Sequence, residues 1–490
     1  PAYQRFLHEK FPKRWPQLVN AAQTNLLNPI GLISVLATLA QTNDLFYLHP
    51  SSGYYFEQFY AEPHGLVYKL KTLPDDTLLP PLPDKNLIAE NESFWSKTEQ
   101  QSFAPIVRAV TPVDPNAPQT LVEKLFAHLH VAPEPNQNAV VAGMLYSRNL
   151  DFWGVQLQRA GELEKAAACF ETAQKINPDN VVAQINLQFN QNLRAGKRVA
   201  VDLSTVTADQ FGKYRSWNQV ILANGPFDEP SFSFEDGVVL VQAGLLRQAV
   251  APFVRVRELA PDNLPARFWL GQLYEISHLP DRAIEALRDP MEQPEKFSLA
   301  EANSTQLNIL AATAYFQKND VEHGTRLIEL EISRHPTNDD ILTTATQIYL
   351  ARGLPASALG VIDRKLSFSP DDVNWLYNKG YVAIQLQKYD VAIAALSRVL
   401  AVQTNNYDAL FKRAGAYLQL GKLDEARADY ASLQQSFTNS AQAAYSLGEI
   451  AWRKHETNEA ARNYGIYLAN APANTAEATN IVERLKSLKH

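Results

Sequence analysis

The chain has 490 residues, of which 46% are hydrophobic and 20% are charged, with a net charge of −7 at pH 7 and a single cysteine. This length is too great for one simple core and predicts several domains or a repetitive architecture. No basic stripe accompanies the acidic balance, so we expect no nucleic-acid partner. One cysteine excludes an intrachain disulfide framework, and Cys169, beside Ala168 and Phe170, is expected to be a small buried hydrophobe.

The longest apolar run is Ile30 to Ala40, and it contains Gly31, Ser34 and Thr38. It is too short to cross a bilayer, so we expect no membrane span in this chain. The sequence begins with Pro1 rather than Met, so an upstream signal or membrane segment stays open.

Residues 1–70 carry no repeat and predict a small α/β module. Phe6 to Ala22 is expected to be helical in pieces, and Pro29 to Gln41 predicts an apolar helix that begins at Asn28. Aromatic and β-branched residues then predict three short strands, with turns at Gly53 and at Pro63–Gly65. The strands are expected at Leu45–Leu48, Tyr54–Tyr60 and Leu66–Leu70.

Residues 71–118 are rich in proline and predict a connector without long regular elements. A short helix near Glu92–Gln101 is the expected exception, with Phe94 and Trp95 as its apolar anchors. Aromatic residues are scarce in flexible linkers. We therefore expect the connector to pack on the helices that follow it.

Residues 119–474 predict helices, most of them in a repeated unit. Five segments of 34 residues follow one another without a gap from 305 to 474, and Pro or Thr closes most of them. Small residues recur at two places of each segment. The eighth place holds Ala312, Thr346, Gly380, Ala414 and Gly448. The twentieth place holds Gly324, Ala358, Ala392, Ala426 and Ala460.

Each unit predicts two amphipathic helices joined by a short turn. Small residues at the eighth and twentieth places let the two helices approach closely. One such pair cannot bury its own apolar face, whereas a stack of pairs can. Earlier units at 147–180, 230–263 and 264–304 follow the same pattern, with an irregular stretch at 181–229 and an insertion near 289–296.

The last residues, 475–490, predict one helix that is apolar on one side and closes the end of the stack. The whole pattern resembles the tetratricopeptide repeat (TPR) family. That resemblance implies a mainly α fold, a right-handed solenoid of helix–turn–helix units, here with the α/β module at its N-terminus. It also implies that the partner is a protein or peptide.

By that resemblance, the second, fifth, ninth, twelfth and thirteenth places of each unit face a concave groove. In the gapless units these places are rich in aromatic residues, which suits the anchoring of a peptide or helix. The alternative is that the same rings pack between neighbouring units. The candidate partner-binding residues are Phe316, Gln347, Tyr377, Tyr381, Phe411, Tyr445, Glu449, Trp452 and Arg453.

His49, Glu57 and His64 are the one cluster in the module with the chemistry for a metal or acid–base site. Their spacing matches no metal motif, and the alternative is that they are solvated or hydrogen-bonded loop residues. The sequence holds no Walker loop, no nucleotide-binding glycine pattern and no Gly-x-Ser-x-Gly elbow. We expect no cofactor, no metal and no catalysis in the chain as given.

A weaker resemblance concerns residues 31–70. The run from Leu45 to Tyr60, followed by Pro63 to Tyr68, is similar to the stretch after the membrane domain of some bacterial multispan proteins that resemble protein O-mannosyltransferases. It implies that this chain is the soluble tail of a larger membrane protein, and an extracytoplasmic or membrane-tethered location. Without it, a cytoplasmic location is expected.

Three functions stay open on this reading of the sequence. The first is a scaffold that binds a peptide, a helix or a neighbouring subunit in the groove. The second is an accessory domain of a membrane glycosyltransferase-like protein. The third is a self-assembling subunit that forms filaments, because a solenoid has two unlike ends.

Overall fold

The structure is a computed structural model of the chain. It describes residues 29–48, 54–110, 136–201, 211–297, 299–437, 440–470 and 476–487, apart from 42, 200 and 213, together with 9, 10, 12, 124 and 128. The helical pieces predicted within Phe6–Ala22 fall outside these residues, apart from isolated positions. The chain divides into two compact units, Pro1–Lys318 (unit 1) and Asn319–His490 (unit 2).

Unit 1 begins with the predicted α/β module. Helix α2 spans Pro29–Ala40, and three strands form an antiparallel sheet in the order β1-β3-β2. Ile33 of the helix packs with Phe59 and Leu70 of the sheet, because both elements are apolar on one face only. The strands are β1 Phe46–Tyr47, β2 Phe59–His64 and β3 Val67–Thr72.

The second strand differs from the prediction. Tyr54–Glu57 forms a 3₁₀ helix, η1, and the strand runs through Pro63 and His64 instead of ending in a turn there. The turn lies at Gly65, whose φ of +67° favours glycine and where a Cβ would meet the Phe94 ring at 2.8 Å. Asn91 fixes this hairpin by accepting a bond from the Gly65 amide and donating one to the Pro63 carbonyl, each at 2.9 Å.

The connector holds longer helices than predicted. Helix α3 spans Lys85–Thr98 and continues through a π turn, η2 (Glu99–Phe103), into α4 (Ala104–Val110). The helix starts early because the Asp84 carboxylate accepts a bond from the Leu87 amide at 2.8 Å and caps it. Trp95 is buried in a cluster with residues of the first repeat helices.

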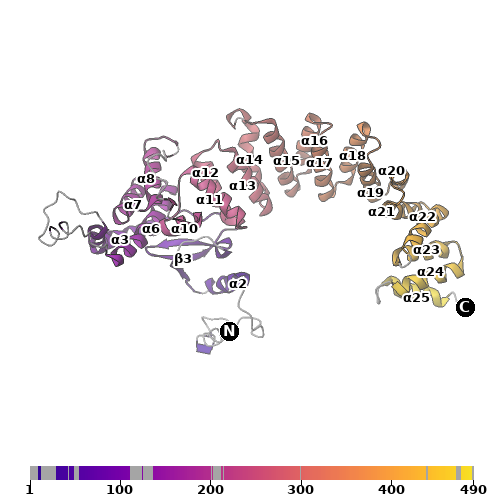
Figure 1. Cartoon of the computed structure of the whole chain (residues 1–490), viewed down its shortest axis with the longest axis horizontal. Helices are drawn as coiled ribbons and strands as arrows, with labels where there is room; N and C mark the ends of the chain where they lie inside the picture. The colour runs from indigo at the N-terminus through magenta and orange to yellow at the C-terminus, as the bar shows by residue number, and fades with distance from the viewer. Residues whose placement is uncertain are drawn as a thin grey trace. The chain divides into compact units, whose positions relative to one another are not determined.

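The repeat helices of unit 1 pack as antiparallel pairs: α6 with α7, α11 with α12, and α13 with α14 (Figure 1). The stretch predicted as irregular contains two helices, α8 and α10, and the insertion forms a short 3₁₀ turn, η4 (Pro294–Phe297). The helices are α6 Gln137–Arg159, α7 Leu163–Ile176, α8 Val181–Arg194, α10 Trp217–Asn224, α11 Pro230–Gln242, α12 Leu246–Leu259, α13 Leu264–Ile276, α14 Pro280–Glu292 and α15 Glu301–Gln317.

In unit 2 each second helix packs on its own partner and on the first helix of the next pair, as α18, α20 and α22 do. The mainly helical, repetitive fold class is therefore confirmed. The helices are α16 Val321–Arg334, α17 Asp339–Ala351, α18 Pro355–Phe368, α19 Val373–Gln385, α20 Tyr389–Val402, α21 Tyr407–Gln419, α22 Leu423–Ser436, α23 Ala441–Arg453, α24 Thr457–Asn470 and α25 Ala476–Ser487.

The eighth place of the repeats is where the two helices of a pair come closest. A Cβ on Gly380 would lie 2.5 Å from Leu396, and one on Gly154 would lie 2.5 Å from Phe170. Both partners occupy the twenty-fourth place of their units. The small residues are thus required by the side chain that fills the notch they leave.

The turn between the two helices of a pair has a left-handed residue at the fifteenth place, a feature that the sequence reading missed. Its φ is +71° at Gly353 and +57° at Gln387. A side chain in this conformation is strained, so glycine suits the place best. Positive φ values at this place also occur at Gly161, Gly244, His278, Asn319, Gly421 and His455.

Candidate functional site

The predicted groove residues of α19 and α21 form one partly exposed patch, here called the aromatic face: Tyr377, Tyr381, Phe411 and Lys412. The Lys412 ammonium lies 5.2 Å from the centre of the Tyr381 ring and 6.0 Å from that of Tyr377. Tyr381 remains 40% exposed. Asp408 accepts a hydrogen bond from the Tyr377 hydroxyl and lies 3.5 Å from the Lys412 ammonium.

Phe411 is held from behind, since its ring meets Tyr430 edge-on with 5.6 Å between the ring centres. The aromatic face therefore combines a rigid base with one exposed tyrosine and a cation held over two rings. Cation–π contacts of this kind contribute about 0.5–1 kcal/mol when exposed to water. The result is a preorganised, amphipathic surface.

The predicted residues of α23 have a different surrounding, because α25 packs beside them. Glu449 accepts a bond from the Tyr464 hydroxyl at 2.7 Å and forms an ion pair with Arg484 of α25. The Arg484 guanidinium also lies 5.3 Å from the centre of the Trp452 ring. Tyr445 packs on Tyr467 with 5.4 Å between the ring centres. The chain's own last helix thus occupies this part of the predicted groove.

The remaining predicted residues are spread out. Phe316 is buried, with 6% of its surface exposed, and belongs to α15 in unit 1. Gln347 is exposed on α17, and Arg453 is exposed at the end of α23. The structure brings Tyr377, Tyr381 and Phe411 together, and Tyr445 with Glu449 and Trp452.

The three candidate metal or acid–base residues of the module are not brought together in the described structure. His49 lies outside the described residues. His64 contacts two carboxylates, with 2.7 Å to Glu90 and 3.1 Å to Glu62. Among the residues that the structure describes, no group of His, Cys, Asp and Glu has the arrangement of a metal site.

Glu57 has a structural role that the sequence did not reveal. Its carboxylate accepts bonds from the backbone amides of Arg247 at 3.0 Å and of Gln248 at 3.2 Å, and from the Gln248 side chain at 2.8 Å. These amides open α12, which has no cap from its own N-cap side chain. The module therefore supplies a carboxylate to the N-terminus of a repeat helix 190 residues away.

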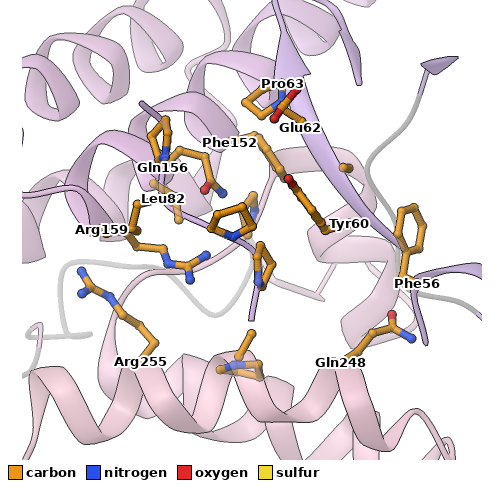
Figure 2. A pocket seen from close by; sticks show the side chains of 18 of the residues that line it. Phe56, Tyr60, Glu62, Pro63, Leu82, Phe152, Gln156, Arg159, Gln248 and Arg255 are labelled. Atoms are coloured by element: carbon orange, nitrogen blue, oxygen red, sulfur yellow. The ribbon is translucent and has the colours of Figure 1, made fainter. Parts of the chain in front are cut away.

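Unit 1 also contains a cavity of about 720 Å³, which the sequence reading missed (Figure 2). Strand β2, the proline-rich segment before α3, and helices α6 and α12 contribute to its wall. Aromatic and proline side chains dominate the lining, and two arginines, Arg159 and Arg255, reach into it from α6 and α12. The thirteenth place of the first repeat, which holds Arg159, was the available signal.

A buried polar network lies behind this cavity. Asn186 donates to Asp151 at 3.0 Å, and both residues are fully buried. Gln158 donates to Asp228 at 2.8 Å. Burial raises the pKa of the Asp151 carboxyl well above its ordinary value, and the neighbouring Asp228 adds to the shift.

The single cysteine packs against the cluster around Trp153 and Phe170. Burial raises the pKa of the Cys169 thiol to about 12, so the thiolate is scarce at neutral pH. Along the described chain, the search for a helix of sufficient length and hydropathy to cross a bilayer finds none.

Comparison with known proteins points to one family. The family model described as "Tetratricopeptide repeat" matches residues 347–406 and 377–441. A curated relative, the TPR repeat-containing protein YpiA of Bacillus subtilis (strain 168), is 21% identical over 232 residues, which are 47% of this chain and 52% of the relative. The chain thus spans about half the length of the curated relative it matches.

Several solved structures are similar over part of the chain. The C-terminal part of a TPR repeat-containing protein from Cytophaga hutchinsonii is 15% identical, with a TM-score of 0.40, and the match covers 50% of this chain and 98% of that one. MamA from Desulfovibrio magneticus RS-1 is 17% identical, with a TM-score of 0.29, 37% of this chain and 95% of that one. YrrB, titled "a TPR protein with an unusual peptide-binding site", is 16% identical, with a TM-score of 0.28, 48% of this chain and 99% of that one.

The matched stretch coincides with α17 to α22, the most regular helix pairs of unit 2. The gapless register, the close approach at the eighth place and the family model agree. The chain therefore belongs to the tetratricopeptide repeat family.

Proposed function

We propose that this chain is a protein-interaction scaffold and that the aromatic face of α19 and α21 binds a partner's amphipathic helix. The observation that carries the proposal is the cation held over Tyr377 and Tyr381 on a surface where Tyr381 stays 40% exposed. Exposed tyrosines on a rigid base are typical anchors of protein interfaces.

The chain itself supports a helix as the occupant. Helix α25 buries Ile481 to 1% exposure and stacks Arg484 on Trp452 while pairing with Glu449. Tyr445, Glu449 and Trp452 stand at the fifth, ninth and twelfth places of their unit. In the units of α19 and α21, the fifth and ninth places supply Tyr377, Tyr381 and Phe411. A partner helix there would repeat, between molecules, what α25 does within one.

This proposal narrows the predicted groove. Trp452 and Glu449 are already engaged by α25, so they are not proposed as contacts of the partner. Gln347 of α17, which is exposed, would lie at the edge of the site. No part of the proposal requires catalysis by this chain.

The test is selection from a displayed library of amphipathic helices, with the Tyr381→Ala variant used for counter-selection. Helices that survive are synthesised and titrated by calorimetry against the wild type, Tyr381→Ala and Tyr407→Ala. Tyr407 is the matched control, because it is 39% exposed but stands at the first place of its unit. We expect Tyr381→Ala to weaken binding at least about tenfold, the usual effect of losing an interface anchor.

Equal binding by the wild type and Tyr381→Ala, or equal losses in both tyrosine variants, would overturn the assignment of the face. Light scattering after size-exclusion chromatography supplies the remaining distinction. If concentrated protein forms larger species that Tyr381→Ala dissolves, the partner helix comes from a second copy of this chain.

A further inference from the structure

A second binding site is present in unit 1, and it does not depend on the proposed function. We propose that the cavity between β2, α6 and α12 binds a small organic carboxylate with an apolar body, and that Arg159 holds the carboxylate. The cavity volume of about 720 Å³ lies in the range of small-molecule sites, which is roughly 300–1,000 Å³.

The wall of the cavity suits an apolar body. Phe152 and Val155 of α6 line one side, Tyr60 of β2 another, and Pro252 of α12 a third. Leu82, which is 54% exposed, stands in the proline-rich segment that closes the remaining side. These side chains gain when an apolar ligand displaces water from between them.

Arg159 provides the polar anchor. It forms no hydrogen bond or ion pair with any residue that the structure describes, and Figure 2 shows its guanidinium in the cavity. Its nearest carboxylate is already engaged: both Asp228 oxygens accept bonds from Arg255, each at 2.7 Å. The Arg159 charge is thus partly buried without a counter-ion in contact, and that burial lowers its pKa.

A second donor stands one turn earlier on the same helix. Gln156 also lines the cavity, and its side chain has no hydrogen-bond partner among the described residues. Its amide and the Arg159 guanidinium project from the same face of α6, because they are three residues apart. Together they offer donors of the kind that bind a carboxylate.

The other charges of the lining do not compete for this anchor. Glu62 and Glu90 are held by His64, Asp84 caps α3, and Asp236 also interacts within the protein. Arg255 is neutralised by Asp228 and also pairs with Glu258 at 3.0 Å. One uncompensated positive charge remains, which matches a singly charged carboxylate better than a doubly charged phosphate.

The experiment uses 11-(dansylamino)undecanoic acid, whose fluorescence rises in an apolar cavity, with its methyl ester as the uncharged match. We expect the full chain to bind the acid more tightly than the ester, and Arg159→Gln to weaken the acid about ten- to a hundredfold, the range for hydrogen bonds to a charged group. Affinity for the ester should not change. Arg194→Gln is the matched control, since Arg194 also ends its helix but pairs with Glu164 outside the cavity.

Decanoate, octyl phosphate and inorganic phosphate are then used as competitors. Displacement by decanoate alone supports the proposal, whereas stronger displacement by either phosphate overturns the choice of a carboxylate. Ala251→Trp, which adds bulk to the cavity wall on α12, should abolish binding of both acid and ester. An equal affinity of acid and ester in the wild type, or an acid affinity unchanged by Arg159→Gln or Ala251→Trp, removes the site. Thermal unfolding verifies that each variant is folded.

Discussion

The first repeat of unit 1 and the regular repeats of unit 2 use the same places for different purposes. The fifth place holds Asp151 in α6 but Tyr377 in α19, and the ninth holds Val155 in α6 but Tyr381 in α19. Asp151 is fully buried in a polar network, whereas Tyr381 is 40% exposed. The difference teaches that a repeat position has no fixed role, and that the elements covering it decide its chemistry.

The covering element in unit 1 is the N-terminal module. The Tyr68 hydroxyl of β3 donates to the Asn149 side chain of α6, and its ring meets Phe152 edge-on with 4.9 Å between the ring centres. In unit 2, α25 performs a similar task for the last pair only. The places in between remain available to a partner.

The largest expected effect comes from loosening the cover of unit 1. Phe59 is 2% exposed in the core of the module, so Phe59→Ala should lower the free energy of unfolding by about 3–5 kcal/mol. Hydrogen–deuterium exchange should show faster exchange in β2, β3 and the start of α12, with α17 to α24 unchanged. A loss of protection confined to unit 2 would contradict this division.

The close approach at the eighth place should be shared by both units. Gly154→Val and Gly380→Val each place a side chain against a filled notch and should cost about 1–3 kcal/mol. Gly360→Ala is the control, because nothing lies within 4 Å of its Cβ position, and it should stabilise by about 0.5–1 kcal/mol. Urea unfolding of the three variants measures this; a neutral Gly380→Val would refute the packing argument.

The buried network of unit 1 should show itself in the pH dependence of stability. The folded state keeps a proton on Asp151 in a pH range where the unfolded state has lost it, since burial raises the folded pKa above 3.8. The contribution of Asp151 therefore falls as pH rises from about 3.8 through the raised pKa. Asp151→Asn, measured by urea unfolding from pH 4 to pH 8, should gain stability relative to the wild type as pH rises. Parallel pH curves for the two proteins would contradict the shift.

The contact between the module and α12 should be worth less. Glu57→Ala removes the acceptor of two helix N-terminal amides and should cost about 1 kcal/mol. Glu235→Ala, at an exposed place on α11, is the control and should change stability by less than about 0.5 kcal/mol. The midpoints of thermal unfolding compare the two, and equal midpoints would remove the capping role.

The smallest effect on stability is expected on the open surface of unit 2. Tyr381→Ala removes an exposed ring and one cation–π contact, so it should change the free energy of unfolding by only about 0.5 kcal/mol. Circular dichroism during thermal unfolding is sufficient to measure it. A loss as large as that of Phe59→Ala would mean that Tyr381 is part of the core and not of a binding surface.

Parts of the fold were predictable because they rest on local pattern. The small residues at 312, 346, 380, 414 and 448 fall in one register, and the helix pairs follow that register. Helix α2 was likewise predicted to within a residue, because Asn28 and an apolar periodicity define it. Helical periodicity and close-packing notches are encoded within one unit, so sequence alone reveals them.

The departures have long-range or conformational causes. Tyr54–Glu57 has strand-like composition but forms a 3₁₀ turn that carries Glu57 to α12. The connector looked irregular because of its prolines, yet Asp84 starts a 14-residue helix between them. For the candidate site, sequence identified the aromatic places of α19 and α21, but it did not reveal that α25 lies over Trp452.

The sequence by itself determined the repeat, its helix pairs and the places where two helices touch, because those features depend on residues within about 34 positions of one another. Only the tertiary structure decided which repeat faces are covered. The cover on α6 comes from strands about 80 residues away in the chain, as the Tyr68–Asn149 bond shows, and no local pattern records such a partner. The Arg159 cavity belongs to this second class, since its walls come from segments that the fold alone brings together.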